Sequence, residues 1–204
     1  MADLNLAVIY YSSTGTNHQM AQWAEEAGND AGANVRLRKI PETAPMEAIE
    51  SNPAWKENYD KTQNIEEAAV EDLEWADAIV FSVPTRFGVE ASQFRAFIDT
   101  TGGLWAQGKL MNKVVSAMSS AQNPHGGQEA TVLSVYKTMA HWGAIIVPPG
   151  YSDPVQFEAG GNPYGVSATA TENGIVEDIE DAVKHQARRT VEVAEWLRHG
   201  QGNG

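Results

Sequence analysis

The sequence predicts an α/β protein in which a five-stranded parallel sheet carries helices on both faces. Short apolar segments of the kind that form buried strands alternate with segments in which apolar residues recur every three or four positions. Such alternation is typical of a doubly wound sheet, and five strands suit the order 2-1-3-4-5. Three of these strand-like segments end in polar loops, which meet at one edge in this architecture. We therefore expect a ligand site at that edge.

The first strand and the first helix have the clearest patterns. Residues 6–11 (LAVIYY) form a nearly continuous apolar run, as expected of a strand that is covered on both faces. A helix that begins near Asn17 would bury an apolar stripe that includes Met20 and Trp23. Residues 33–40 then alternate apolar and basic residues, which predicts an edge strand.

The remaining segments continue this alternation. Strands are predicted at residues 76–83, 113–118 and 144–147, and helices are predicted through Phe94 to Ile98, at 129–142 and from Ile175 onward. The strand at 76–83 should stop at Pro84, because proline cannot continue a central ladder.

Two segments fall outside the pattern. Residues 41–72 are rich in Pro, Asn, Glu and Lys, and they predict a surface insertion with one short helix. Residues 148–174 are rich in Gly, Pro, Asn and Thr and are far longer than an ordinary connection, which indicates a functional or intersubunit role. The whole chain, residues 1–204, is nevertheless expected to form one domain.

The composition is strongly acidic. Against 27 acidic residues there are 14 basic ones, a net charge of -13, so the surface should repel nucleic acid and anionic membranes. No apolar run approaches the roughly 18 residues of a membrane span, and the N-terminus has no basic leader, which predicts a cytoplasmic protein without membrane insertion. The acidity fits either an ordinary acidic surface or a halophilic adaptation to high salt.

Cysteine is absent from the chain. This excludes disulfides, iron–sulfur clusters, thiolate zinc sites and cysteine nucleophiles, and we predict no metal ligands elsewhere. Any redox chemistry must therefore come from a bound organic cofactor.

The first polar loop has the features of a phosphate-binding turn. It consists of Ser12, Ser13, Thr14, Gly15, Thr16 and Asn17. Four hydroxyl groups and several backbone N–H groups thus lie at a helix N-terminus, where the helix dipole favours an anion. The loop lacks the lysine of a nucleoside triphosphate P-loop and the glycines of a dinucleotide fingerprint. The alternative is a simple polar turn that caps the helix with a serine or threonine.

Two further loops should lie beside this turn. The second loop consists of Pro84, Thr85, Arg86, Phe87 and Gly88, and the third spans residues 119–128 (SSAQNPHGGQ). Arg86 and Phe87 offer a flat cation and an aromatic ring, although on their own they would more simply be a surface charge and a core residue. Together with the phosphate turn, these loops suit a phosphate joined to a flat ring, which suggests FMN.

Six motifs give the chain a family resemblance. They are YYSSTGTN (10–17), VPTRFG (83–88), TGGLWAQGKL (101–110), GGQEAT (126–131), AHWGAIIVPPGY (140–151) and GGNPYG (160–165). With these, the chain resembles the WrbA-type NAD(P)H:quinone oxidoreductases of the flavodoxin-like superfamily over nearly its whole length. The resemblance implies a flavodoxin-like fold, noncovalently bound FMN, NADH or NADPH as co-substrate, a quinone as the second substrate, and a homotetramer.

The resemblance also assigns individual residues. It implies that residues 12–17 bind the FMN phosphate and that residues 84–88 lie along the isoalloxazine ring. The ring's other edge would be covered by Ser120, Ala121, Gln122, Asn123, Pro124, His125 and Gly126. His141 matches a histidine that reaches the flavin site, and Trp105 matches a tryptophan that lines the slot for nicotinamide and quinone. Arg86 and His141 are then candidate catalytic residues that would stabilise negative charge on the reduced flavin or quinone.

Three positions depart from the family pattern. Thr14 stands where many members carry a tyrosine associated with the nicotinamide cofactor. The third loop is one residue longer than usual and has less glycine and threonine. Trp142 follows His141 where a second histidine is common.

The implied reaction is a ping-pong transfer in which NAD(P)H gives a hydride to flavin N5 and a quinone then takes two electrons from the same slot. The alternative is a flavodoxin-like carrier of single electrons to protein partners, but such a carrier has no need of TGGLWAQGKL and GGNPYG as walls of a substrate slot. A receiver-type regulatory module would need acidic residues at the end of the first strand, where this chain has Tyr10, Tyr11 and Ser12.

Overall fold

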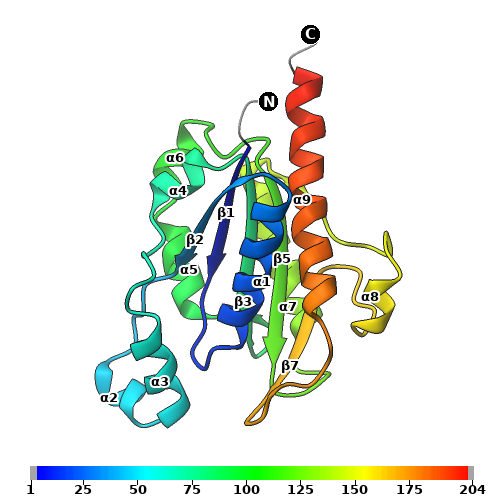
Figure 1. Cartoon of the computed structure of the whole chain (residues 1–204). Coiled ribbons are helices and arrows are strands. Elements are labelled where there is room, and N and C mark those ends of the chain that lie inside the picture. Colours follow the sequence, from blue (N-terminus) through cyan, green and yellow to red (C-terminus); the bar gives the residue numbers. More distant parts are fainter. Residues whose placement is uncertain (1–3, 202–204) are drawn as a thin grey trace.

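The computed structural model describes residues 4–201 and places a central β-sheet between two layers of helices (Figure 1). The five main strands are β1 (Asn5–Tyr10), β2 (Asn34–Lys39), β3 (Ala78–Arg86), β5 (Val114–Ala121) and β7 (Ser167–Thr171). They are parallel and lie in the order β2-β1-β3-β5-β7. The predicted fold class and strand order are confirmed, whereas the predicted stop at Pro84 is wrong, because β3 continues through Pro84 to Arg86 and Pro84 still pairs with Ser120.

Three two-residue strands extend the sheet. They are β4 (Val89–Glu90), β6 (Ile145–Ile146) and β8 (Gly174–Ile175). Both β4 and β8 are antiparallel to the strands that precede them, β3 and β7. Within residues 4–201 the sheet therefore holds eight strands, three more than the five predicted.

The fifth position of the sheet is divided between two strands. β6 pairs with the start of β5, at Val114 and Val115, and β7 pairs with its end, from Ser119 to Ala121. The prediction that residues 148–174 form only a long connection is wrong, because β7 lies within them. Its sequence, SATAT, lacks the bulky apolar run that marks a buried strand, so the strand pattern is weak.

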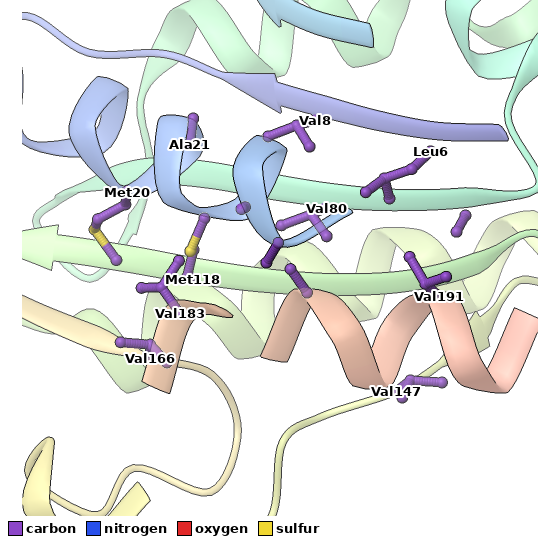
Figure 2. Packing of buried hydrophobic residues seen from close by; sticks show 14 of the residues in the cluster. Leu6, Val8, Met20, Ala21, Val80, Met118, Val147, Val166, Val183 and Val191 are labelled. Atoms are coloured by element: carbon purple, nitrogen blue, oxygen red, sulfur yellow. The ribbon is translucent and has the colours of Figure 1, made fainter. Parts of the chain in front are cut away.

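Alternate residues of each strand build two separate cores. Val8 and Val80 face the layer formed by α1 (Thr16–Asp30) and α9 (Glu180–Gln201), and Figure 2 shows them packed with Met20, Met118 and Val191. The residues between them, Ile9 and Phe81, face the opposite layer. That layer holds α4 (Val70–Trp75), α5 (Ser92–Asp99), α6 (Gly102–Ala106) and α7 (Gln128–Trp142).

The helices that follow β1 and β5 begin within one residue of the predicted positions. The last helix does not: it starts at Glu180, because Ile175 belongs to β8. Among the described residues, no helix combines the length and the apolar character that a membrane span requires.

The insertion after β2 is more structured than predicted. It contains two short helices, α2 (Met46–Glu50) and α3 (Pro53–Lys61), before α4. The Asn52 side chain accepts hydrogen bonds from the N–H groups of Ala54 and Trp55, and Pro53 occupies the first helical position, so α3 begins with a standard cap. Figure 1 shows α2 and α3 at the end of the sheet toward which the strands point. A further short helix, α8 (Val155–Glu158), lies between β6 and β7.

Candidate cofactor site

The three predicted loops meet in one pocket of about 450 Å³ at the carboxyl edge of the sheet. The residues that line it are Ser12, Ser13, Thr14, Thr16, Asn17, Asn52, Trp55, Pro84, Thr85, Arg86, Phe87, Ser120, Ala121, Gln122, Asn123, Gly126 and Ala170. Arg86 is the only charged residue among them. In a protein of net charge -13, the absence of carboxylates from this lining makes the pocket suitable for an anionic ligand.

The first loop, residues 12–17, forms the N-terminus of α1. Gly15 caps the helix with a φ of 100°, a conformation that glycine adopts without strain, and its N–H donates to Ser12 Oγ at 3.0 Å. The first N–H groups of a helix have no acceptor within the helix, and the first turn of α1 carries no acidic side chain. Together with the surrounding hydroxyl groups, these N–H groups can bind a phosphate.

Asn17 has a structural role that the sequence did not reveal. Its side chain is buried, donates to Ser82 Oγ at 3.0 Å and accepts from Ser120 Oγ at 2.5 Å. Ser82 Oγ in turn donates to the Asn17 carbonyl. These bonds fix the start of α1 to β3 and β5, so Asn17 can offer a ligand its backbone N–H while its amide group is already engaged.

The second loop, residues 84–88, presents its side chains to the solvent side of the pocket. Phe87 has a φ of 54° and its side chain is fully exposed, so it is not a core residue. The Arg86 guanidinium donates to Ser13 Oγ and to the Thr85 carbonyl, both at 2.8 Å. Arg86 therefore links the second loop to the first and places a positive charge beside residues 12–17.

The third loop packs against the second through backbone atoms. A Cβ atom at Gly127 would lie 2.8 Å from Gly88 Cα, so only glycine allows this approach. Thr85 Oγ1 donates to the Gly126 carbonyl at 3.4 Å and accepts from Thr131 Oγ1 at 2.8 Å. Pro124 and His125 point elsewhere: they line a neighbouring cavity of about 510 Å³ and not this pocket.

Three residues from the insertion belong to the site, and no local pattern in the sequence predicted them. Asn52 and Trp55 line the pocket, and Asn58 contacts the back of the first loop. The N-cap pattern at Asn52 could have predicted the start of α3. Nothing in the sequence, however, indicates that this helix packs against a loop about forty residues earlier.

Trp105 and His141 lie together, but at the opposite edge of the sheet. Trp105 Nε1 donates to the His141 carbonyl at 3.0 Å, and both side chains are exposed. His141 is at the C-terminal end of α7, which begins two residues after Gly126 of the pocket lining, and a helix of 15 residues is roughly 20 Å long. Within one chain, the structure does not bring either residue to the pocket.

Burial shifts the pKa of Tyr11, the residue that immediately precedes the first loop. It raises the pKa of the Tyr11 hydroxyl well above its usual value, and the nearby Glu42 carboxylate raises this pKa further. The hydroxyl therefore stays protonated, and it donates to Glu42 Oε2 at 2.9 Å.

Comparison with known proteins places the chain in a family. Residues 4–155 match the family described as NADPH-dependent FMN reductase. A protein of Deinococcus radiodurans named NAD(P)H dehydrogenase (quinone) is 56% identical over 196 residues, which cover 96% of this chain and 98% of the relative. A protein of Archaeoglobus fulgidus with the same name is 37% identical over 192 residues, which cover 94% and 98%.

Solved structures agree on the fold. A WrbA-like flavodoxin from Agrobacterium tumefaciens has a TM-score of 0.63 and 22% identity, with 97% of this chain and 99% of that chain covered. A flavodoxin from the domain Archaea has a TM-score of 0.61 and 14% identity, with 94% and 99% covered. The chain has a flavodoxin-like fold and belongs to the NADPH-dependent FMN reductase family, among relatives named NAD(P)H dehydrogenase (quinone), which confirms the resemblance drawn from its motifs.

Proposed function

We propose that this protein binds FMN noncovalently and uses it to reduce quinones with NADH or NADPH. The observation that carries the proposal is the first loop, where hydroxyl groups and helix N–H groups face a pocket whose one charged residue is Arg86. A phosphate monoester fits this donor set, because the helix dipole and the guanidinium both favour an anion. A single cradle of this kind suits FMN better than a dinucleotide flavin.

The rest of the pocket fits a flat ring. Pro84 to Phe87 and Ser120 to Asn123 line the same pocket as the first loop, so a ring whose phosphate is bound at residues 12–17 would lie along the second and third loops. The exposed ring of Phe87 is free to contact such a ligand. Pro124 and His125, which line the neighbouring cavity, are less suited to touch the same ring.

Bound FMN would supply the redox chemistry, accepting a hydride at N5 from NAD(P)H and returning two electrons to a quinone in a ping-pong cycle. The names of the relatives support this choice of substrates. Arg86 would offset the negative charge that develops on the reduced ring or quinone, and its bonds to Ser13 and Thr85 already orient the guanidinium.

Trp105 and His141 can take part only if a second subunit supplies them, which supports an oligomer, and the family resemblance makes that oligomer a homotetramer. Other features favour assembly as well. Tyr151 and Phe157 stack on each other at 4.8 Å with most of their surface exposed, in the segment between β6 and β7. Tyr164, in the same segment, is also exposed. Exposed aromatic surface of this kind is typical of protein interfaces.

An absorbance spectrum of the purified protein tests the proposal. Flavin bands should be present, disappear when NADH or NADPH is added without oxygen, and return when benzoquinone follows. If neither nucleotide reduces the flavin while the chemically reduced protein passes single electrons to a protein acceptor, the protein is instead an electron carrier.

Light scattering tests the tetramer and should be done in high salt as well as low salt. Subunits of charge -13 repel one another when screening is weak, so dissociation at low salt alone leaves the proposal intact. A monomer mass in high salt would contradict it.

A further inference from the structure

The insertion after β2 touches the phosphate-binding loop from behind. Asn58, on α3, is buried, and its side-chain amide donates to the carbonyl oxygens of Ser12 at 2.9 Å and Ser13 at 3.2 Å. Asn58 does not line the 450 Å³ pocket; it lines a separate cavity of about 90 Å³ on the other side of the loop. The loop therefore lies between Asn58 and the pocket.

This contact fixes which way the loop's N–H groups point. In a trans peptide the C=O and N–H groups point in opposite directions, and both peptides here are trans. Because the carbonyls of Ser12 and Ser13 are bonded to Asn58, the N–H groups of the next residues, Ser13 and Thr14, are directed away from it. Successive N–H groups held on one side of a turn form a concave anion site.

Glu42 holds α3 in place. Its carboxylate accepts hydrogen bonds from the Trp55 indole N–H at 3.2 Å, the Tyr11 hydroxyl at 2.9 Å and the Gln93 amide at 2.7 Å. One partly buried set of bonds thus connects α3, the end of β1 and α5. Asn58 is presented to the loop by a helix that is fixed at several points.

We propose that Asn58 is a positioning residue that sets the protein's preference for phosphorylated flavin over riboflavin. It would act only through the loop, by orienting N–H groups toward the phosphate, and would not contact the isoalloxazine ring. This inference rests on the proposed function, because it assumes that residues 12–17 receive the FMN phosphate.

Comparing the binding of FMN with that of riboflavin distinguishes this role from general support of the fold. FMN and riboflavin share the ring and the ribityl chain and differ only in the phosphate. If Asn58 orients phosphate donors, its loss should weaken FMN binding and leave riboflavin binding nearly unchanged. If Asn58 merely supports the fold, both ligands should lose affinity equally.

The experiment measures the Kd of the flavin-free protein for FMN and for riboflavin by flavin fluorescence. Asn58→Ala should raise the Kd for FMN about tenfold, the loss expected for one to two hydrogen bonds, with less than about a twofold change for riboflavin. Asn58→Asp keeps the shape but cannot donate to the carbonyls, so it should weaken FMN binding at least as much. Asn64→Ala, at an exposed position of the same insertion, is the matched control and should change neither Kd.

Thermal unfolding of each flavin-free variant accompanies the binding data, so that a misfolded variant is recognised. Equal losses for the two ligands, or an unchanged Kd for FMN in folded Asn58→Ala and Asn58→Asp, would overturn the proposal. The proposed function fails in a different way: the unmodified protein would then bind no flavin, or would bind FMN and riboflavin equally.

Discussion

The chain passes from strand to helix at the candidate site in two places that share a left-handed glycine and have different surroundings. Gly15 precedes α1 with a φ of 100°, and Gly127 precedes α7 with a φ of 99°. In each case the N–H four residues later donates to the glycine carbonyl, from Gln19 and from Thr131. The positive φ and this hydrogen bond therefore do not distinguish the two junctions.

Their surroundings do distinguish them. Around Gly15 the nearest atom to an added Cβ is a side-chain oxygen of Asn58, at 3.5 Å, and the first turn of α1 has no acidic residue. Around Gly127 the backbone of Gly88 is at 2.8 Å, and Glu129 already supplies a negative charge to the first turn of α7. The surroundings of the first junction suit an anion and those of the second suit packing, so a left-handed glycine before a helix does not by itself indicate a ligand site.

The largest effect is expected at the second junction, around Gly127, where a substitution should lower folding stability. Gly127→Val should lower the free energy of unfolding by about 3 kcal/mol or more, because the side chain meets backbone atoms and the φ is strained. Urea unfolding measures the change. Gly32→Val is the control, since Gly32 also has a positive φ but has no atom near its Cβ position, and it should lose only about 1–2 kcal/mol. Equal losses would mean that the backbone contact is unimportant.

At the first junction, around Gly15, a substitution should affect FMN binding more than folding stability. Gly15→Val should weaken FMN binding by about 100-fold, because a branched side chain would disturb the loop whose N–H groups are proposed to bind the phosphate. Its loss of folding stability should match that of Gly32→Val. Equilibrium titration with FMN and urea unfolding give the two values. A variant that binds FMN with unchanged affinity would show that the phosphate lies elsewhere.

Trp105, which lies on α6 and bonds to the far end of α7, can be used to test whether the site extends across subunits. Trp105→Ala should raise the KM for both quinone and NAD(P)H several-fold, to about tenfold, and leave FMN bound, because the indole would line a slot that both substrates share. The unmodified enzyme should give parallel double-reciprocal lines. Loss of FMN from the variant would mean that Trp105 is structural, and intersecting lines would mean that the substrates use separate sites.

The smallest effect is expected on the pH dependence of folding stability, through a histidine at the first junction. His18 lies three residues after Gly15 and stacks on Tyr10. The corresponding position at the second junction, three residues after Gly127, is Ala130. Burial lowers the pKa of His18 below its ordinary value of 6.5. The unfolded chain therefore takes up this proton first, and stability should fall as the pH drops below about 6.5 toward the folded-state pKa.

Replacing His18 isolates this contribution. His18→Phe keeps a ring against Tyr10 and removes the titration, so it should lose less stability between pH 7 and pH 5 than the unmodified protein, by under about 1 kcal/mol. Urea unfolding at the two pH values measures the difference. An identical pH dependence in both proteins would show that His18 does not contribute.

Much of the fold could be predicted because burial imposes regular patterns on the sequence. The apolar runs at 6–11 and 76–83 predicted buried strands, and the parallel topology then placed their loops at one edge. The pattern failed at β7, where small residues are buried and give no strong strand preference. Hydrophobic periodicity reveals a buried segment only when its side chains are strongly apolar. It therefore misses strands that bury small side chains.

The candidate site was predictable where it depends on topology and not where it depends on packing. Three strand ends had to meet, whereas the contact of Asn58 with Ser12 spans 46 residues and depends on how α3 lies against the loop. Trp105 and His141 illustrate a different limit. Motif resemblance assigned both to the flavin site, but a motif does not say which subunit delivers its residues.

The divided fifth strand bears on how this fold can change in evolution. Three residues, 116–118, separate the two pairings along β5, whereas 20 residues, 147–166, separate β6 from β7 on the partner side. The register of β7 is set by its own bonds to β5, so the excursion can gain or lose residues without moving any β7 side chain to the other face. An insertion at this point can thus add contact surface for assembly. It would leave the pairing register of the sheet and the edge that carries the first loop unchanged.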